Sequence, residues 1–395
     1  MKHLNKFIYI LFLVIVYSCT DPYALQTNTF EDVIVIEATI TNELKKQEIK
    51  ISRTFQLEEK EPQIETNATV YIIDDLGNQF NFEESNGKYI SEFEFQAFPE
   101  REYQLYIITN KGKHYSSTRE KLSTINNLTS IEASVKNKFG INGVDITANS
   151  FDPSGTSKYY RYEYEETYRF SVPYWSNDSL IVIGEYPFTF GINERNGESK
   201  TCYKSEKPKN IILENTTSFL EDRVSDFSIR FISQENYIIA DRYSILVKQY
   251  VQNLESYNFY YTLQKISNSG GILSPNQPGF IYGNISAVEN KNEKVIGFFD
   301  VSSVSEKRIF FNYTDLFPGE PLPAYFYECE ILDYDETKLS SPGVTPSDGN
   351  KALGALARQK DLILYQNNSP IYRMVIPECG DCRTTGSNII PDFWE

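Results

Sequence analysis

Apolar and polar residues alternate along most of the chain, and this period of two is typical of half-buried β-strands. The alternation begins near Val33 and continues in short runs to about residue 122. Segments that combine glycine with Asn or Asp separate the runs, at residues 74–78, 86–87 and 110–112. Such segments favour hairpin turns, because glycine accepts positive φ without steric cost. The spacing of strands and turns predicts an Ig-like β-sandwich of the regulatory type over residues 31–122.

Alternation resumes in residues 123–395, with longer strands and longer connections. In the run 160–165, tyrosines lie on one face and charged residues on the other, directly after a turn at 152–155. This order of strand, turn and strand is typical of a fibronectin type III sandwich. Residues 172–210 are irregular and predict long insertions. We therefore expect a larger fibronectin-III-like β domain over residues 123–395, ending in a cysteine-containing tail.

One segment follows the helical period instead of the strand period. Asn253 is a suitable N-cap, and Gly270-Gly271 would end the helix. Between them, four apolar residues share one helical face: Phe259, Tyr260, Leu263 and Ile266. The pattern predicts a single α-helix over residues 253–268 that packs across an edge of the larger sandwich.

The first residues read as an export signal. Lys2 and Lys6 precede an unbroken apolar run at 7–17, which is shorter than the about 20 residues that a membrane-spanning helix needs. The order Val16-Tyr17-Ser18-Cys19 matches a bacterial lipobox. We expect a lipoprotein signal peptide at 1–18, acylation of Cys19 and a polar tether at 19–30. An ordinary leader with a chance cysteine, or a buried core segment, is the alternative.

Composition and charge narrow the class of partner. The 395 residues carry a net charge of −16, and removal of Lys2 and Lys6 with the leader leaves −18. This sign repels phosphate backbones and anionic lipid faces, which argues against nucleic acid and against electrostatic docking to membranes. The lipid on Cys19 would then attach the protein to the bilayer. The chain has 29 tyrosines and 26 phenylalanines, which favours β-structure.

Four cysteines remain beyond Cys19: Cys202, Cys329, Cys379 and Cys382. An exported chain meets oxidising conditions, in which thiols pair, so we expect structural disulfides of unassigned connectivity. The CxxC spacing at 379–382 also fits a redox dithiol or half of a zinc site. His114 is the only histidine after the leader, however, and zinc would lack its ordinary ligands.

The residues show no signature of catalysis, and we expect no cofactor, no metal and no enzymatic activity. Asp74 and Asp75 with Asn78 could ligate calcium but lack the alternating order of a calcium loop. The best candidates for contacts to a ligand or partner are aromatic residues of the irregular 172–210 segment, because loops on sandwiches carry function. They are Tyr174, Trp175 and Tyr186.

Three segments together carry a family resemblance. They are Cys19 with the extended start 20–23, the region 243–308, and the terminal Cys379-Gly380-Asp381-Cys382-Arg383 with Pro391-Asp392-Phe393-Trp394. The chain resembles the Bacteroidetes lipoproteins that carry domain of unknown function 4249, over nearly its whole mature length. The resemblance implies an outer-membrane lipoprotein, usually encoded beside a TonB-dependent transporter of the SusC type. It implies no known reaction.

We therefore expect a lipid-anchored, non-catalytic accessory or binding subunit of a TonB-dependent transporter barrel. The alternatives are an adhesin or structural scaffold of the cell envelope and, third, an unrecognised hydrolase. The sequence does not name the ligand, and it leaves open whether the protein faces the cell surface or the periplasm.

Overall fold

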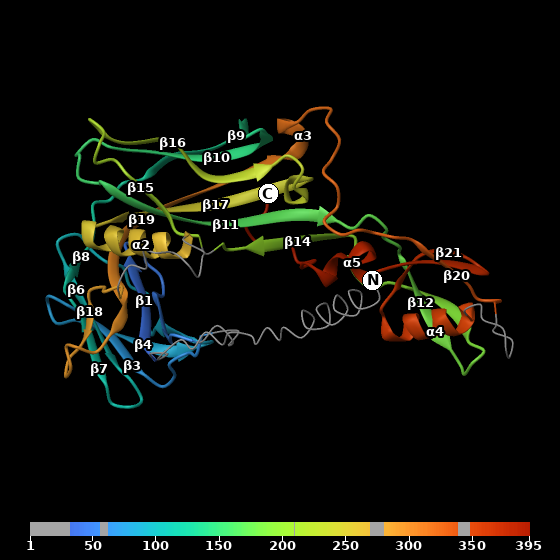
Figure 1. Cartoon of the computed structure of the whole chain (residues 1–395), viewed down its shortest axis with the longest axis horizontal. Helices are drawn as coiled ribbons and strands as arrows, with labels where there is room; N and C mark the ends of the chain where they lie inside the picture. Colours follow the sequence, from blue (N-terminus) through green and yellow to red (C-terminus); the bar gives the residue numbers. More distant parts are fainter. Residues whose placement is uncertain (1–31, 56–61, 209, 269–279, 339–347) are drawn as a thin grey trace, which may run out of the picture.

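The computed structural model describes residues 32–55, 62–208, 210–268, 280–338 and 348–395. The predicted leader, the tether and Cys19 lie outside the described residues. Strands make up 49% of the structure and helices 12%, which confirms the prediction of a mostly β protein. The described strands form one 14-stranded sheet and three small sheets (Figure 1).

The N-terminal strands form the first half of the large sheet, in the order β1-β2-β5-β4-β3-β6-β7-β18. Their bounds are β1 (Ile34–Thr41), β2 (Glu48–Arg53), β3 (Thr69–Asp74), β4 (Gln79–Ser85), β5 (Lys88–Ser91), β6 (Glu102–Ile108), β7 (His114–Ser117) and β8 (Glu120–Lys121). The predicted turn at Asn86-Gly87 joins β4 to β5, with both residues at positive φ. Alternate residues of these strands meet in one apolar core.

One long strand, β19 (Val295–Asn312), belongs to both halves of the large sheet. Its first half pairs in parallel with β1, and its second half, from Ser303, pairs in antiparallel with β17 (Arg242–Gln252). The short strand β18 (Ile285–Ala287) also joins the N-terminal strands, by pairing with β7. Residues on both sides of the expected boundary at residue 122 therefore contribute strands to the same large sheet.

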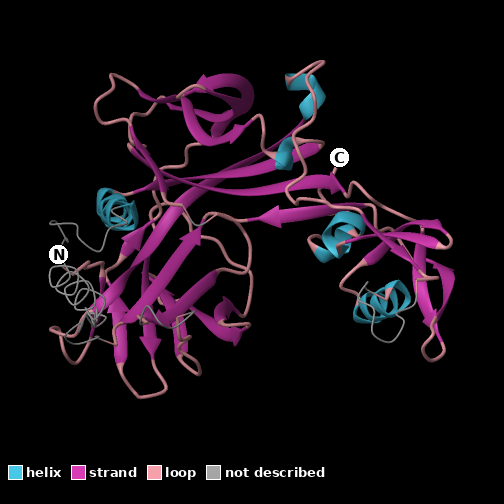
Figure 2. Ribbon diagram, turned by 45° about the vertical axis from the view of Figure 1, so that its right-hand side comes forward, coloured by secondary structure: helices cyan, strands magenta, loops and turns pink. Residues whose placement is uncertain are grey.

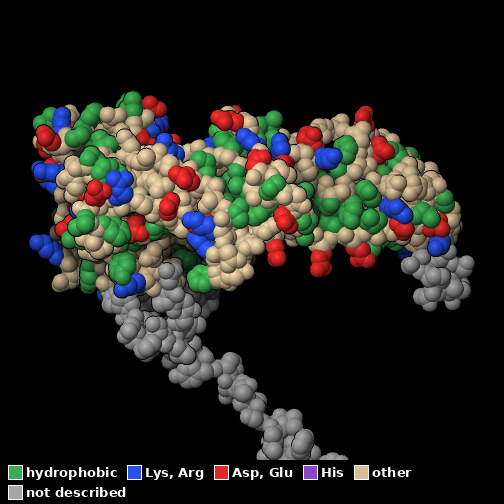
Figure 3. Space-filling view, turned by 90° about the horizontal axis from the view of Figure 1, so that it is seen from above, with side chains coloured by type: hydrophobic (Ala, Val, Ile, Leu, Met, Phe, Trp, Pro, Cys, Tyr) green, Lys and Arg blue, Asp and Glu red, His purple; other side chains and the backbone are tan. Residues whose placement is uncertain are grey.

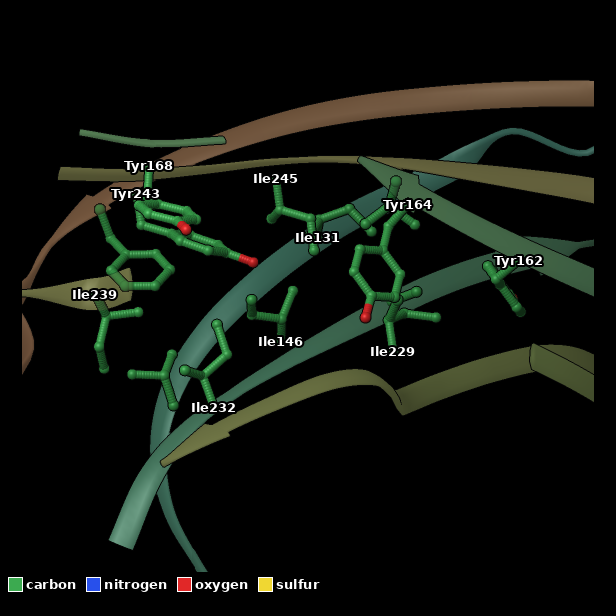
Figure 4. Packing of buried hydrophobic residues seen from close by; sticks show 14 of the residues in the cluster. Ile131, Ile146, Tyr162, Tyr164, Tyr168, Ile229, Ile232, Ile239, Tyr243 and Ile245 are labelled. Atoms are coloured by element: carbon green, nitrogen blue, oxygen red, sulfur yellow. The ribbon is translucent and has the colours of Figure 1, made fainter. Parts of the chain in front are cut away.

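The second half of the large sheet faces a three-stranded sheet across a second core. It consists of β17, β11 (Tyr159–Ser171), β14 (Thr201–Glu206) and β15 (Ile212–Asn215), and the opposing strands are β9 (Leu128–Lys138), β10 (Ile141–Asp152) and β16 (Asp222–Ser233). The short helix η1 (Tyr237–Ile239) precedes β17. Four of the five tyrosines of β11 (Tyr160, Tyr162, Tyr164 and Tyr168) belong to this core, where Tyr164 lies near Ile229 and Ile131 (Figure 4). The predicted tyrosine face is thus the buried face.

The predicted helix is present as α2 (Leu254–Asn268). The Asn253 side chain accepts a hydrogen bond from the backbone N–H of Ser256 at 2.7 Å, as expected of an N-cap. Gly270-Gly271 lie outside the described residues. The helix packs on the outer face of the large sheet, where the rings of Phe259 and Phe298 are 5.6 Å apart.

A smaller lobe extends from the far end of β11 and β14 (Figure 2). This lobe, which we call the distal lobe, comprises β12 (Asp178–Ile183), β13 (Thr189–Glu194), β20 (Leu332–Asp335), β21 (Ile363–Asn368), β22 (Ile371–Val375), α4 (Gly349–Gln359), α5 (Pro377–Gly380) and η2 (Cys382–Thr384). The short helix α3 (Tyr313–Leu316) follows β19. The prediction of a single helix missed α4, because this helix contains two glycines and depends on packing, with Leu353 fully buried.

Candidate functional site

A polar cleft lies where the two halves of the large sheet meet. Its volume is about 450 Å³, within the range of small-ligand sites in proteins. We call it the junction cleft, and its lining residues are Arg119, Glu120, Lys121, Leu122, Ser123, Thr124, Thr156, Val251, Gln252 and Asn253. Leu122 and Val251 are the only apolar residues among them. A second hollow, beside Asp74, has a volume of about 20 Å³ and holds no more than about one water.

The connection from β8 to β9 forms one wall of the junction cleft and is held on both neighbouring strands. The Ser123 hydroxyl donates to the backbone carbonyl of Val251 at 2.6 Å and accepts from the backbone N–H of Ser303 at 2.9 Å. The Ser303 hydroxyl in turn donates to the carbonyl of Thr124 at 2.6 Å. These bonds fix the wall at the point where β19 passes from one half of the sheet to the other.

Glu120 joins the wall to the start of α2. Its carboxylate accepts hydrogen bonds from Nδ2 of Asn253 at 2.9 Å and Nδ2 of Asn284 at 2.8 Å. The Thr118 hydroxyl donates to the same carboxylate at 2.6 Å. With three donors, Glu120 is fixed in position, and its charge is partly compensated before any ligand binds.

Two cations stand at the rim of the junction cleft. Arg119 and Lys121 lie 3.6 Å and 3.2 Å from the carboxylate of Glu102, and their side chains are 61% and 63% exposed. Together with Glu120, these groups make two positive and two negative charges. On the face shown in Figure 3, acidic and basic side chains are likewise mixed along the molecule.

Gln252 lies at the buried end of the junction cleft and is 3% exposed. Its Nε2 donates to the Ser256 hydroxyl at 2.8 Å and to Oδ2 of Asp300 at 3.2 Å. Its Oε1 has no hydrogen-bond partner among the described residues. A buried acceptor without a partner is uncommon in proteins and marks Gln252 as a residue to explain.

A buried layer of charge lies behind Gln252, under α2. Burial raises the pKa of Asp300, and the nearby Arg161 guanidinium opposes this rise. That guanidinium lies between two rings, 4.2 Å from the centre of Tyr250 and 4.6 Å from that of Tyr260. It also forms an ion pair with Glu163. This layer holds α2 on the sheet and thereby fixes one side of the junction cleft.

The three aromatic residues expected to contact a ligand do not come together, and none lines the junction cleft. Tyr174 packs against Tyr365 with ring centres 5.0 Å apart. The Trp175 indole N–H donates to the Ser199 hydroxyl at 3.0 Å. Tyr186 lies between β12 and β13, where its hydroxyl donates to Asp348 at 2.5 Å.

The four cysteines form two disulfides, Cys202–Cys382 and Cys329–Cys379, which confirms that prediction. The two cysteines of the CxxC segment therefore pair with distant partners and not with each other. Cys202 belongs to β14 and Cys382 to the distal lobe, so this bond ties the lobe to the large sheet.

The residues weighed for metal binding are engaged in local structure. Asp74 accepts hydrogen bonds from two backbone N–H groups, those of Leu76 and Asn78, and from the Arg101 guanidinium. His114 is half exposed and lies 3.1 Å from Glu289. Across the described ranges, three or more His, Cys, Asp or Glu residues never gather as a metal would require. Nor does any helix in that part of the chain have the length and apolarity to cross a membrane.

The junction cleft has no motif in the sequence that predicts it. Asn253 was recognised as a helix cap, but Glu120 and Gln252 carried no motif. The one available signal was Gln252 itself, a polar residue at the end of a long strand and directly before a helix. Its burial depends on β19 and α2, which are distant in sequence from the 119–124 wall.

The fold is that of a mostly β protein with two disulfides and a polar cleft at the joint of its large sheet. The profile of the family described as Domain of unknown function (DUF4249) matches residues 20–308, and the chain belongs to this family. A search of curated proteins finds no match.

Proposed function

We propose that the protein is an outer-membrane lipoprotein that acts as a non-catalytic binding subunit beside a TonB-dependent, SusC-like transporter. One observation carries the anchoring part of this proposal. The family match begins at residue 20, directly after the cysteine of the lipobox. Cleavage before Cys19 would therefore leave the entire matched region attached to the acylated residue.

The polar cleft supports a role in binding more than a role in hydrolysis. A glycoside hydrolase of the usual kind needs two carboxylates that face each other across the substrate. Among the residues that the structure describes, Glu120 is the only acid that lines the junction cleft, and three donors already hold it. The cleft can bind and orient a ligand, and attachment to the bilayer would keep that ligand near a transporter barrel.

We propose further that the N-terminal strands form an Ig-like sandwich and the central sheets a fibronectin-III-like one. A second candidate function is an envelope adhesin or scaffold. The distal lobe favours it, because this lobe projects from one end of the molecule and is fixed there by a disulfide (Figure 1).

The test is an affinity pull-down from detergent-solubilised envelopes of the native bacterium. A tag inserted at the exposed turn after Gly77 leaves the chain ends and the cleft unchanged. We expect a TonB-dependent barrel to co-purify with the wild-type protein, and Cys19→Ala to be released into the soluble fraction without it. An adhesin would be isolated alone, and that result would remove the transporter role. Protease treatment of intact cells would then assign the protein to the cell surface or the periplasm.

A further inference from the structure

We propose that the junction cleft binds an uncharged ligand rich in hydroxyl groups, of the mono- or disaccharide class. The inference rests on the proposed function as a binding protein, whose ligand class it names. It requires neither the lipid nor the transporter, so it can be tested with the purified chain.

The partners of the Gln252 amide fix its orientation. The Asp300 carboxylate can accept but, when ionised, cannot donate, so the Nε2 of Gln252 must face it. The contacts of 2.8 Å to Ser256 and 3.2 Å to Asp300 agree with this orientation. Oε1 then faces away from these partners and needs a donor. Oε1 is itself buried, so a ligand reaches it only by moving a neighbouring side chain at the inner end of the cleft; a hydroxyl placed there would supply the donor, whereas a carboxylate or phosphate would not.

The charges in and around the junction cleft balance. Glu102 lies within 3.6 Å of both rim cations, and Glu120 adds a second negative charge within the cleft. An anionic ligand would be repelled by Glu102 and Glu120, and a cationic ligand would be repelled by Arg119 and Lys121. A neutral ligand avoids both costs.

The junction cleft offers both hydrogen-bond donors and hydrogen-bond acceptors. Thr124 and Thr156 place their hydroxyls 2.9 Å apart at one side of the cleft, and both residues are exposed. Each hydroxyl can both donate and accept, as the hydroxyls of a sugar do. With eight of ten lining residues polar, the cleft gives little room to an apolar ligand. The volume of about 450 Å³ is ample for a small saccharide.

The experiment uses the full mature chain in a zwitterionic detergent, because detergents with sugar headgroups would compete. The probes are glucose, galactose, N-acetylglucosamine, cellobiose and lactose, with glucuronate as the charged counterpart. Saturation-transfer NMR detects binding, and calorimetric titration measures the Kd. Thr124→Trp fills the cleft at an exposed position, and Thr189→Trp on β13 is the matched control.

We expect at least one neutral sugar to bind, Thr124→Trp to abolish binding and Thr189→Trp to leave it unchanged. Gln252→Met should weaken binding by about fivefold or more, the value of one hydrogen bond. If Gln252→Met fails to fold, the comparison of sugar binding by Thr124→Trp and Thr189→Trp still tests the proposal. The proposal is overturned if no neutral sugar binds, if glucuronate alone binds, or if Thr124→Trp binds like the control. If any of these results is obtained while a transporter still co-purifies, the ligand class is rejected and the proposed function is retained.

Discussion

The guanidinium of Arg161 lies 4.6 Å from the centre of the Tyr260 ring, and this contact joins the sheet to α2. Arg161 comes from β11 and is 6% exposed, and Tyr260 lies on the helix. Asp300, 1% exposed on β19, is close enough for its charge to raise the pKa of Arg161. Helix, sheet and β19 thus meet in one buried layer directly behind the junction cleft.

We expect Arg161→Met to lower the free energy of unfolding by about 3–5 kcal/mol, because it leaves Asp300 buried without its counter-charge. Urea unfolding followed by circular dichroism measures the loss. Arg119→Met, at an exposed rim position, should change stability by less than about 0.5 kcal/mol. Equal unfolding midpoints for the two variants would show that the buried layer does not hold α2 on the sheet.

A second prediction concerns acid stability. Burial alone would raise the pKa of Asp152, but hydrogen bonds from Ser154 and Ser157 outweigh it and hold the pKa below its ordinary value of 3.8. A lowered folded pKa stabilises the protein above the unfolded pKa, and this contribution is lost as the pH falls through the folded pKa. We expect Asp152→Asn to cost roughly 2 kcal/mol at neutral pH.

The measurement is the urea midpoint of both proteins from about pH 6 down to about pH 2. The difference in urea midpoint between wild type and Asp152→Asn should narrow as the pH falls below 3.8. A gap that stays constant over this range would contradict the assignment, because the carboxylate charge would then contribute nothing to the turn at 152–155.

The disulfide between Cys202 and Cys382 should control the attachment of the distal lobe. Replacing both cysteines by serine should cost about 2–5 kcal/mol and loosen the lobe before the rest of the molecule. Hydrogen exchange measures this directly, as faster exchange in β12 and β13 with unchanged exchange in β1–β7. If exchange rose equally in all of these strands, the lobe would not be a separate unit of stability.

Gly297 is the single glycine of β19, and we expect its replacement to be costly. A Cβ atom there would lie 2.4 Å from the carbonyl oxygen of Ile36, so Gly297→Ala must separate β1 from β19. We expect a loss of roughly 3 kcal/mol, at the upper end of overpacking costs. Gly112→Ala is the control: its φ of +75° carries backbone strain, but no atom lies within 4 Å of the added Cβ.

Thermal unfolding of both variants distinguishes the cost of backbone strain at positive φ from the cost of the steric clash between the added Cβ and Ile36. Backbone strain at positive φ costs about 1–2 kcal/mol, so Gly297→Ala should unfold at a lower temperature than Gly112→Ala. The reverse order would mean that β19 can shift away from β1 without loss, and that the two halves of the sheet are less tightly joined than described.

Local patterns predicted local structure well. Asn86-Gly87 forms a hairpin turn, Asn253 caps its helix, and the tyrosines of 160–165 point into a core. Each of these features depends mainly on residues close in sequence, so a local pattern could predict it. The path of β19 depends on pairing with strands more than forty residues away, and no local pattern encodes it.

The cleft illustrates the same limit for function. Its wall at 119–124, Thr156 and Gln252 come from three distant parts of the chain, and hydrogen bonds of Ser123 and Ser303 bring them together. The connectivity of the cysteines was equally inaccessible, since four cysteines allow three pairings. The proposed lipobox, in contrast, is a contiguous motif that needs no fold to be read, and acylation of Cys19 stays a prediction.

Anchoring through Cys19 is the central claim, and the mass of the mature N-terminal peptide tests it most directly. The peptide would be obtained by proteolysis of protein purified from the envelope of the native bacterium. We predict a peptide that begins at Cys19 and carries the added mass of acyl chains. A peptide that retains residues 1–18, or one that begins at Cys19 without added mass, would contradict the account.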